Sequence, residues 1–325
     1  MQATLRRPGI DRAILRQRAE MLARIRHFFA AREVLEVETP VLSGAAVTDP
    51  NLTSLTSCFN GPGSRNGQTL YLHTSPEFAM KRLLAAGSGD IYQIAKVFRD
   101  GELGRHHSPE FTLLEWYRVG FDHQRLMDDV SALIRQITPA SVPLTEQRYR
   151  YRELFRLHLG LDPLQTTVDE LANCAQANDI VVPSGMPRAD RDIWLDLLLT
   201  HCIEPQLNPA QLTFIYDYPA SQAALARIRA DEPPIAERFE LYWGGVELAN
   251  GFHELNDPAE QRRRFEADNH IRAQRGLPLM PLDEPLLAAL SCLPDCAGVA
   301  LGLDRLLMVM TGKTRLADVI TLPFE

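Results

Sequence analysis

The feature that most constrains the fold is a pair of adjacent glycines, Gly244 and Gly245, between two runs of β-prone residues. The runs span 239–243 and 246–250 and are rich in aliphatic and aromatic side chains. The two-residue turns of tight β-hairpins need positive φ, and glycine adopts positive φ without steric cost. This segment therefore predicts a β-hairpin.

The register of this hairpin decides which face its glutamates share. If Trp243 pairs with Val246, then Glu240 faces Ala249, and Glu240 and Glu247 become diagonal neighbours on one face. Their Cβ atoms then lie roughly 7–8 Å apart. Two carboxylates at this separation suit Mg²⁺, which binds oxygen and keeps several waters for a phosphate partner. The alternative is a solvated hairpin face with ordinary acidic residues.

A third glutamate, Glu254, follows the hairpin. Strict alternation places it on the face opposite to Glu247. A β-bulge at Asn250-Gly251 would bring Asn250, Phe252 and Glu254 back to the Glu247 side, and glycine suits a bulge. We therefore predict a bulge at these two residues.

A second hairpin is predicted from residues 91–99 and 111–117, which alternate like strands on either side of a polar loop. Arg99 ends the first strand. The residues that share one face of the second strand are Phe111, Leu113, Glu115 and Tyr117. The loop adds candidates for phosphate contacts, namely Arg105, His106 and His107. One face thus offers an aromatic plate, a carboxylate, a phenol and a guanidinium, although Arg99 could instead be a structural ion pair for Glu115.

The third informative segment runs from 291 to 312. Residues 296–301 are small and apolar and predict a tightly packed strand, and the apolar run 306–310 predicts a helix. Arg305 falls where strand gives way to helix, and Gly298 and Gly302 permit close backbone approach to a ligand. The alternative is an exposed arginine near a helix start, where the macrodipole disfavours a cation.

The order of predicted elements indicates an α+β fold with an antiparallel sheet flanked by helices, because strands and helices come in separate runs. Asp11 is expected to cap a helix to about Arg32. Strands dominate from about 34 to 117, and a further strand is expected at 212–218. The other expected helices are 123–136, 151–160, 167–178, 190–202 and 258–276.

Composition is typical of a cytoplasmic enzyme without a nucleic-acid footprint. The 325 residues are enough for one large domain, and 34 basic against 42 acidic residues leave a net charge of −8. No apolar signal-peptide core begins the chain, and no run reaches membrane-spanning length. The five cysteines have no paired zinc spacing and are expected to be reduced thiols.

In order along the chain, several segments resemble the class II aminoacyl-tRNA synthetases, specifically their lysine branch. The segments that resemble the three class II motifs are 28–40, 98–117 and 302–305. Ser75-Pro76-Glu77 and 247–254 resemble additions of the lysine branch. The resemblance runs from about Asp11 to the C-terminus and is thin between about 138 and 208. It implies a single catalytic domain over 1–325 with a mostly helical insertion at about 138–208, and a C₂ homodimer.

Within this branch the chain resembles the ligases that attach (R)-β-lysine to a lysine side chain of elongation factor P. The residues before Asp11 are too few for the N-terminal oligonucleotide-binding barrel of a bacterial lysyl-tRNA synthetase, so tRNA binding is not expected. Ala300 and Ser75 stand where the synthetases have glycine and alanine. An added methyl near the α-carbon pocket would disfavour an α-amino group by about 1–3 kcal/mol.

The resemblance implies an ATP site that contains Mg²⁺. It assigns Arg99 to the α-phosphate and the substrate carboxylate, and Arg305, helped by Arg105, to the γ-phosphate. Phe111 would stack on adenine with Arg305. The carboxylates expected to hold Mg²⁺ are Glu240 and Glu247. Further residues expected around ATP are Asp100, Gly101, Glu102, Ser108, Leu248 and Gly302.

The second motif departs from the family pattern at two positions. Gly101 replaces the glutamate that usually touches the adenine amino group, and Glu102 follows one residue later. Either Glu102 takes over this contact or backbone groups of Asp100 and Gly101 replace it. Ser108 stands where the family often has asparagine.

For the amino-acid substrate, the resemblance places Glu77 at the backbone amine. The residues expected around the terminal ammonium are Glu115, Tyr117 and Glu254. The rest of the pocket would be lined by Ser75, Pro76, Asn250, Phe252 and Ala300. No general base for the transfer step is obvious in the sequence.

Three alternatives stay open. The chain could be a free-standing lysine-activating core that charges tRNA, or a non-catalytic paralogue that senses an amino acid. Loss of Arg99, Arg305 or the metal carboxylates would have favoured the sensor, but all are present. A carboxylate-rich metal hydrolase is less favoured, because the sequence shows no evident histidine ligand set.

Overall fold

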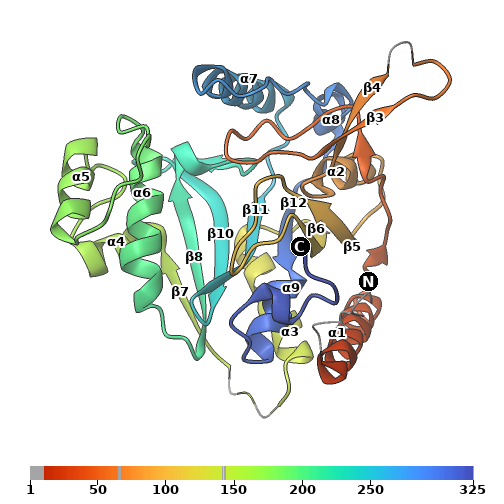
Figure 1. Ribbon diagram of the computed structural model, residues 1–325, viewed down its shortest axis with the longest axis horizontal. Coiled ribbons are helices and arrows are strands. Elements are labelled where there is room, and N and C mark those ends of the chain that lie inside the picture. The colour runs from red at the N-terminus through yellow and green to blue at the C-terminus, as the bar shows by residue number, and fades with distance from the viewer. Residues whose placement is uncertain (1–10, 65–66, 141, 143, 325) are drawn as a thin grey trace, which may run out of the picture. The chain divides into compact units, whose positions relative to one another are not determined.

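The computed structural model describes residues 11–64, 67–140, 142 and 144–324 (Figure 1). The N-terminal stretch considered above for a signal peptide lies outside these residues. The chain divides into two compact units, which we describe separately. The first unit is Met1–Pro139 with Leu255–Glu325, and the second is Ala140–Glu254.

The main sheet of the first unit consists of four strands. In spatial order these are β1 (Leu35–Glu36), β5 (Ile91–Phe98), β6 (Glu110–Val119) and β12 (Cys296–Gly302). β1 and β5 pair in parallel, and the other two pairs are antiparallel. β5 and β6 are joined by the polar loop, so the second predicted hairpin is confirmed. A small sheet in the order β2-β4-β3 completes the strands: β2 (Leu42–Ser43), β3 (Thr56–Phe59) and β4 (Gln68–Leu72).

The first helix, α1 (Arg12–Ala30), forms where the Asp11 cap predicts it. Asp11 accepts a hydrogen bond from Ala13 N and caps the helix. Buried apolar residues recur along one face at Ile14, Met21, Ile25 and Phe28. α1 packs against α3 (His123–Ile137), and α3 packs against β12. The helices thus cover the sheet that carries the predicted site.

One helix interrupts the region where strands were expected to dominate. α2 (Glu77–Ala85) begins directly after Ser75-Pro76 and buries Met80 and Leu84. It has no side-chain cap, because Pro76 occupies the N-cap position. A nine-residue helix without a capping residue leaves little trace in the sequence.

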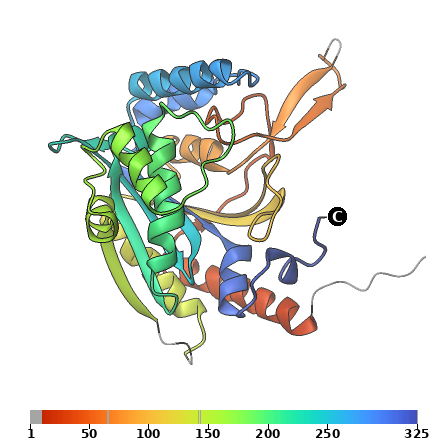
Figure 2. The same ribbon diagram turned by 60° about the vertical axis from the view of Figure 1, so that its left-hand side comes forward.

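The C-terminal part of the first unit supplies α7 (Pro258–Gln274), α8 (Glu284–Ala289) and α9 (Leu303–Met310). α7 and α8 lie side by side in both views (Figures 1 and 2). α7 starts at an Asp257 cap followed by Pro258, a favoured first helical residue. α9 follows β12 without a loop, so Arg305 lies in the first turn of α9.

The second unit holds a sheet in the order β11-β10-β8-β7, with β9 (Ile228–Arg229) beside β10. The strands are β7 (Thr145–Arg150), β8 (Gln211–Pro219), β10 (Ile235–Trp243) and β11 (Val246–His253). The helices are α4 (Tyr151–Leu159), α5 (Val168–Ala177) and α6 (Arg191–Leu198). α6 continues as a π-helical turn, Leu199–Ile203, and a 3₁₀ turn, Glu204–Gln206. An apolar core that includes Tyr151, Phe155 and Trp194 joins these helices to the sheet.

The glycine hairpin forms, but its bulge lies elsewhere than predicted. Trp243 pairs with Val246, as expected, whereas Glu240 pairs with Asn250 and not with Ala249. The extra residue is Leu248, so the bulge predicted at Asn250-Gly251 was placed wrongly. The pairs on either side of the bulge are Tyr242 with Glu247 and Leu241 with Ala249.

The bulge has a packing reason. Leu248 and Ala249 are consecutive apolar residues, and both are buried, with exposures of 3% and 2%. Regular alternation would expose one of them, whereas a bulge lets both face the core. Beyond it, Asn250 and Phe252 return to the face of Glu247, as predicted.

The described helices include none that is both long enough and apolar enough to cross a membrane. All five cysteines lie in the described part of the chain and are free thiols, as expected.

Candidate active site

The predicted site residues of the first unit converge on one face of β6 and β12. Ala300 is the cross-strand partner of Glu115, and Gly298 is the partner of Tyr117. Directly opposed residues share a face and have Cβ atoms about 4.5–5.5 Å apart. Gly298 places no side chain opposite Tyr117. The result is a polar floor, Glu115 and Tyr117, beside small residues.

Glu115 is a buried carboxylate held by two hydroxyl groups. Ser75 Oγ donates to Glu115 Oε2 at 2.6 Å, and Tyr117 OH donates to Glu115 Oε1 at 2.8 Å. Burial, and after it the negative charge of Glu77, raise the pKa of Glu115 to about 7. A carboxyl group with this pKa is only partly charged near neutral pH, and a neighbouring cation would favour its charged form.

Glu77 is paired with a lysine that the sequence analysis missed. Lys81 Nζ donates to Glu77 Oε1 at 2.7 Å, and the lysine side chain is only 1% exposed. Ser75 Oγ accepts from Glu77 N at 3.0 Å and so connects this pair to Glu115. The only signal in the sequence was the i,i+4 spacing on α2, which is common on solvated helices.

Arg99 lies over the ring of Phe111, with 5.0 Å from its guanidinium carbon to the ring centroid. Among the described residues it forms an ion pair with Glu102, at 3.6 Å, and it also donates weakly to Thr74 O at 3.4 Å. The alternative in which Arg99 pairs with Glu115 is therefore wrong. Glu102 therefore faces Arg99 in the loop.

Arg305 is engaged by the loop between β5 and β6. Its Nε donates to His106 O at 3.1 Å, and its Nη2 lies 2.8 Å from His107 Nε2. Burial and the charge of Arg305 lower the pKa of His107, so the neutral imidazole can accept this hydrogen bond. Arg305 is thus partly buried and oriented, and it is not the freely exposed arginine of the alternative interpretation.

Asp304, the residue before Arg305, ties the start of α9 to neighbouring elements, and the sequence analysis missed this role. Asp304 is 3% exposed and accepts from Thr112 N at 2.6 Å. It also forms an ion pair with Arg18 of α1 at 2.5 Å. Asp304 therefore attaches the start of α9 to β6 and to α1.

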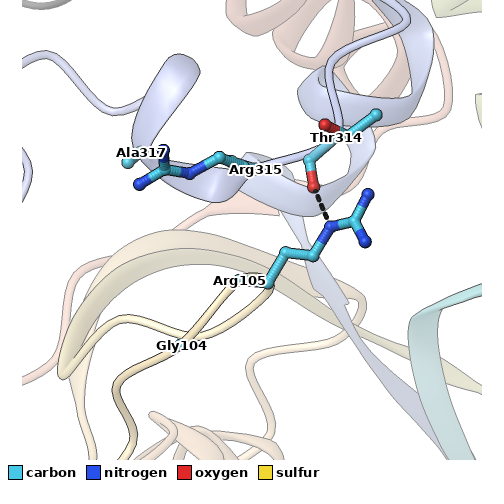
Figure 3. A pocket seen from close by; sticks show the side chains of 5 residues that line it. All are labelled: Gly104, Arg105, Thr314, Arg315 and Ala317. Carbon is cyan, nitrogen blue, oxygen red and sulfur yellow. Dashed lines mark hydrogen bonds between the residues drawn. The ribbon is translucent and has the colours of Figure 1, made fainter.

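The loop also contacts the C-terminal segment. Arg105 Nε donates to Thr314 O at 2.8 Å, and Leu316 N donates to Arg105 O at 2.9 Å (Figure 3). A surface cavity of about 400 Å³ is lined by Gly104, Arg105, Thr314, Arg315 and Ala317. Arg105 is exposed, whereas Ser108 is buried and Gly101 has a positive φ of 80°. The backbone at Gly101 is thus one that a glutamate would rarely adopt.

In the second unit, Glu240 is surrounded by donors. Tyr218 OH and Tyr242 OH each donate to Oε2 at 2.7 Å, and Arg238 Nη2 donates to Oε1 at 2.5 Å. The two phenols use the two lone pairs of Oε2, and Arg238 uses one of the two on Oε1. One lone pair of Oε1 remains for a hard cation. Together with the half-buried Glu247, this donor set fits Mg²⁺.

Glu204 is a further acidic residue here that the sequence analysis missed. Tyr242 OH lies 3.3 Å from Glu204 Oε1. Burial raises the pKa of Glu204, and the negative charges of Glu240 and Glu247 also raise it; together they bring it to about 7. Glu204 begins a 3₁₀ turn after α6, far from the hairpin in sequence, so no local pattern pointed to it.

The remaining predicted residues lie along β11. Asn250 and Phe252 are half-buried, and Glu254, just after the strand, is 1% exposed. Arg238 Nε donates to Asn250 Oδ1 at 3.2 Å. Leu248 occupies the bulge with its side chain in the core. The predicted residues therefore form two sets, one in each unit.

Comparison with known proteins agrees with this chemistry. The family described as tRNA synthetases class II (D, K and N) matches residues 3–325. A protein of Vibrio cholerae serotype O1, named elongation factor P–(R)-β-lysine ligase, is 51% identical over 95% of each chain. Proteins of the same name from Yersinia enterocolitica and Salmonella paratyphi B are 50% identical; the former covers 97% of this chain and 96% of its own length, the latter 94% and 93%. The predicted α+β fold and the resemblance to the lysine branch are confirmed: the chain belongs to the class II tRNA synthetase family of the D, K and N type.

Proposed function

We propose that the chain activates (R)-β-lysine with ATP and transfers it to a lysine side chain of elongation factor P. The observation that carries the substrate assignment is the pairing of Ala300 with Glu115, a methyl group opposite a buried carboxylate. The relatives named for this reaction support the rest, because each spans nearly the whole chain.

In the activation step, the substrate carboxylate attacks the α-phosphorus of ATP and pyrophosphate leaves in line. Negative charge on the phosphoryl oxygens must be balanced, so fixed cations are the main catalytic device. We assign Arg99 to the α-phosphate and the substrate carboxylate, and Arg305 to the γ-phosphate. The ring of Phe111 stacks on adenine. Arg105 donates to Thr314 O through Nε, so its two Nη groups can assist at the phosphate.

The substrate ammonium groups are assigned to the buried carboxylates. Glu115 and Tyr117, with Glu254, receive the terminal ammonium, and Glu77 receives the other amine. The Lys81–Glu77 ion pair keeps Glu77 in place beneath this amine. Asn250 and Phe252 line the remaining wall.

Glu240 and Glu247 are the proposed ligands of Mg²⁺. When bound, the ion neutralises phosphate charge. Arg238 and the two phenols hold the Glu240 carboxylate in one orientation, which lowers the entropy lost when a cation binds.

Ala300 and Ser75 are the proposed selectivity residues. The Ala300 methyl narrows the space near the α-carbon, and Ser75 fills the space beside Glu115 with a bonded hydroxyl. An amine moved to the β-carbon avoids the methyl, and one methyl discriminates by about 1–3 kcal/mol.

Assembly and location complete the proposal. We propose one catalytic domain with a helical insertion at about 138–208, a C₂ homodimer through α1 and the following strand, and a cytoplasmic location without tRNA binding. The free cysteines support a reducing compartment. Light scattering at micromolar concentration tests the dimer, and a monomeric mass would refute it.

The test of the function is ATP–pyrophosphate exchange with (R)-β-lysine, (S)-β-lysine and α-lysine, followed by transfer to elongation factor P or to tRNA. The proposal predicts the fastest exchange with (R)-β-lysine. Preference for α-lysine with charging of tRNA would favour a free-standing synthetase core. Binding of an amino acid without exchange would favour the sensing paralogue.

A further inference from the structure

The guanidinium of Arg238 uses all three of its nitrogens within the second unit. Nη2 donates to Glu240 Oε1 at 2.5 Å, and Nε donates to Asn250 Oδ1 at 3.2 Å. Nη1 donates to the main-chain oxygen of Gln222 at 2.8 Å. The ring of Tyr218 lies beneath it, 4.5 Å from the guanidinium carbon. One side chain therefore joins a carboxylate, an amide and the main chain.

Strand geometry explains how one residue reaches all of them. Arg238 and Glu240 are two positions apart on β10 and so share a face, and Asn250 is the cross-strand partner of Glu240. The bulge at Leu248 produces this pairing. Without it, Glu240 would face Ala249, and Arg238 would have no amide diagonal to it.

We propose that Arg238 is a positioning residue that couples the Glu240 carboxylate to the Asn250 amide. The inference rests on the proposed function, in which Glu240 binds the metal and Asn250 lines the amino-acid pocket. Arg238 itself touches neither ATP nor the amino acid in this proposal. It acts by fixing the two residues that do.

The first effect of Arg238 concerns Asn250. An arginine has only donors, so the amide must turn its oxygen toward Nε. The amide NH₂ is then directed away from Arg238 as a donor. A donor at this point suits an acceptor oxygen of the substrate and not an ammonium group.

The second effect concerns Glu240. Arg238 neutralises the carboxylate charge and occupies one lone pair of Oε1, while the phenols occupy Oε2. The carboxylate cannot rotate without breaking an ion pair whose members are only 17% and 10% exposed. The direction of the remaining lone pair is thereby set before a cation binds.

Arg238 is anchored in turn by the turn that follows β8. Gln222, whose main-chain oxygen accepts from Arg238, also donates through Nε2 to Asp196 Oδ1 of α6 at 2.7 Å. These contacts connect α6, a helix of the predicted insertion, to β10, the strand that carries the proposed metal ligand Glu240. A lysine at position 238 would keep the charge but could not reproduce the planar fork that reaches three acceptors.

The test compares Arg238→Met and Arg238→Lys with wild type. The metal readout is Mn²⁺ binding, followed by electron paramagnetic resonance in the presence of a non-hydrolysable ATP analogue. We expect roughly tenfold or greater weakening in both variants, because the fork geometry matters beyond the charge. The KM for (R)-β-lysine should also rise by about tenfold. Thermal melting checks the fold of each variant.

A matched control and a double-mutant cycle make the test specific. Arg148→Met removes another strand arginine of the same unit, one that pairs with Glu146 and lies over Phe214, and should leave both readouts unchanged. Asn250→Ala combined with Arg238→Met should raise the KM no more than Arg238→Met alone, if the arginine acts on the substrate through Asn250.

Wild-type Mn²⁺ binding and KM in folded Arg238→Met would overturn the inference. Unfolding of both Arg238 variants would also overturn it, because the arginine would then be a structural residue. If wild type shows no exchange with any lysine, the proposed function fails, while the Mn²⁺–nucleotide measurement still decides the role of Arg238.

Discussion

Glu115 in the first unit and Glu240 in the second are both nearly buried carboxylates on central strands, yet their surroundings are opposite. Glu115 accepts hydrogen bonds from two hydroxyls, Ser75 and Tyr117, and its charged neighbour Glu77 is of like sign. Glu240 also accepts from two hydroxyls, those of Tyr218 and Tyr242, but it accepts a third hydrogen bond from Arg238. Among the described residues, Glu115 has no directly bonded cation, whereas Glu240 is paired directly with Arg238.

This difference indicates two kinds of cation site. A buried carboxylate without a counter-ion is unstable until a cation arrives, so Glu115 suits a substrate ammonium that binds and leaves in each cycle. A carboxylate that is already paired suits a site that must keep its shape between cycles. The proposed function assigns ammonium binding to Glu115 and metal binding to Glu240.

The largest expected effect is that of Glu240→Gln. Removing this charge leaves Arg238 mostly buried without its ion pair and removes a proposed metal ligand. We expect loss of roughly a hundredfold or more in pyrophosphate exchange and a loss of about 3 kcal/mol in unfolding free energy. Urea unfolding and exchange assays measure the two. Unchanged stability would show that the pair with Arg238 is not a structural ion pair.

Glu115→Gln should show the reverse combination. The KM for (R)-β-lysine should rise by roughly a hundredfold, since a charged hydrogen bond in a buried site is lost. Stability at pH 8 should not fall, because the substitution removes a carboxylate whose charged form is disfavoured by burial. If Glu115→Gln lowers the melting temperature but leaves the KM normal, then Glu115 has a structural role and does not bind the substrate ammonium.

Ala300→Gly tests whether the methyl group opposite Glu115 selects the substrate. If the methyl excludes an α-amino group, the variant should raise activation of α-lysine by about 1–3 kcal/mol, or roughly ten- to a hundredfold. Activation of (R)-β-lysine should change less. Exchange rates for both substrates decide the matter. A wild type that already prefers α-lysine, with no shift in the variant, would make Ala300 a packing residue.

The smallest expected effect is a pH dependence that belongs to Glu115. Its pKa is raised from 4.5 to about 7, so the folded protein holds a proton that the unfolded chain has lost. The associated stability is present below about 4.5 and is lost as the pH rises through about 7. Substrate binding needs the charged form, so KM for (R)-β-lysine should fall with rising pH, by at most about tenfold per unit below 7.

Glu115→Gln serves as the control for this profile. In this variant, neither the KM for (R)-β-lysine nor the melting temperature should show the change with pH that Glu115 causes in wild type. A profile that persists in Glu115→Gln would assign the titration to another group, such as Glu204, whose pKa is also raised to about 7.

Local patterns in the sequence predicted the elements well where one physical signal dominates. The Gly244-Gly245 turn fixed the pairing of Trp243 with Val246, and the Asp11 cap fixed the start of α1. The bulge was misplaced because a glycine was given more weight than two consecutive buried apolar residues. The α2 helix was missed because Pro76 precedes it without a capping side chain.

The candidate site was less predictable wherever a residue acts through a partner distant in sequence. Asp304 bonds to Thr112 and Arg18, and Glu204 approaches Tyr242, across separations that no periodicity reveals. Lys81 and Arg238 have the spacing of ordinary surface ion pairs. Only burial, which depends on the tertiary fold, distinguishes them from solvated charges.

The central claim is that this chain forms a bond between (R)-β-lysine and a protein lysine. The most direct measurement is the intact mass of elongation factor P after incubation with the enzyme, ATP, Mg²⁺ and (R)-β-lysine. The account predicts a mass increase of one β-lysyl group on a single lysine, absent without ATP and absent with Arg305→Ala. No mass change on elongation factor P, together with charging of tRNA by α-lysine, would contradict it.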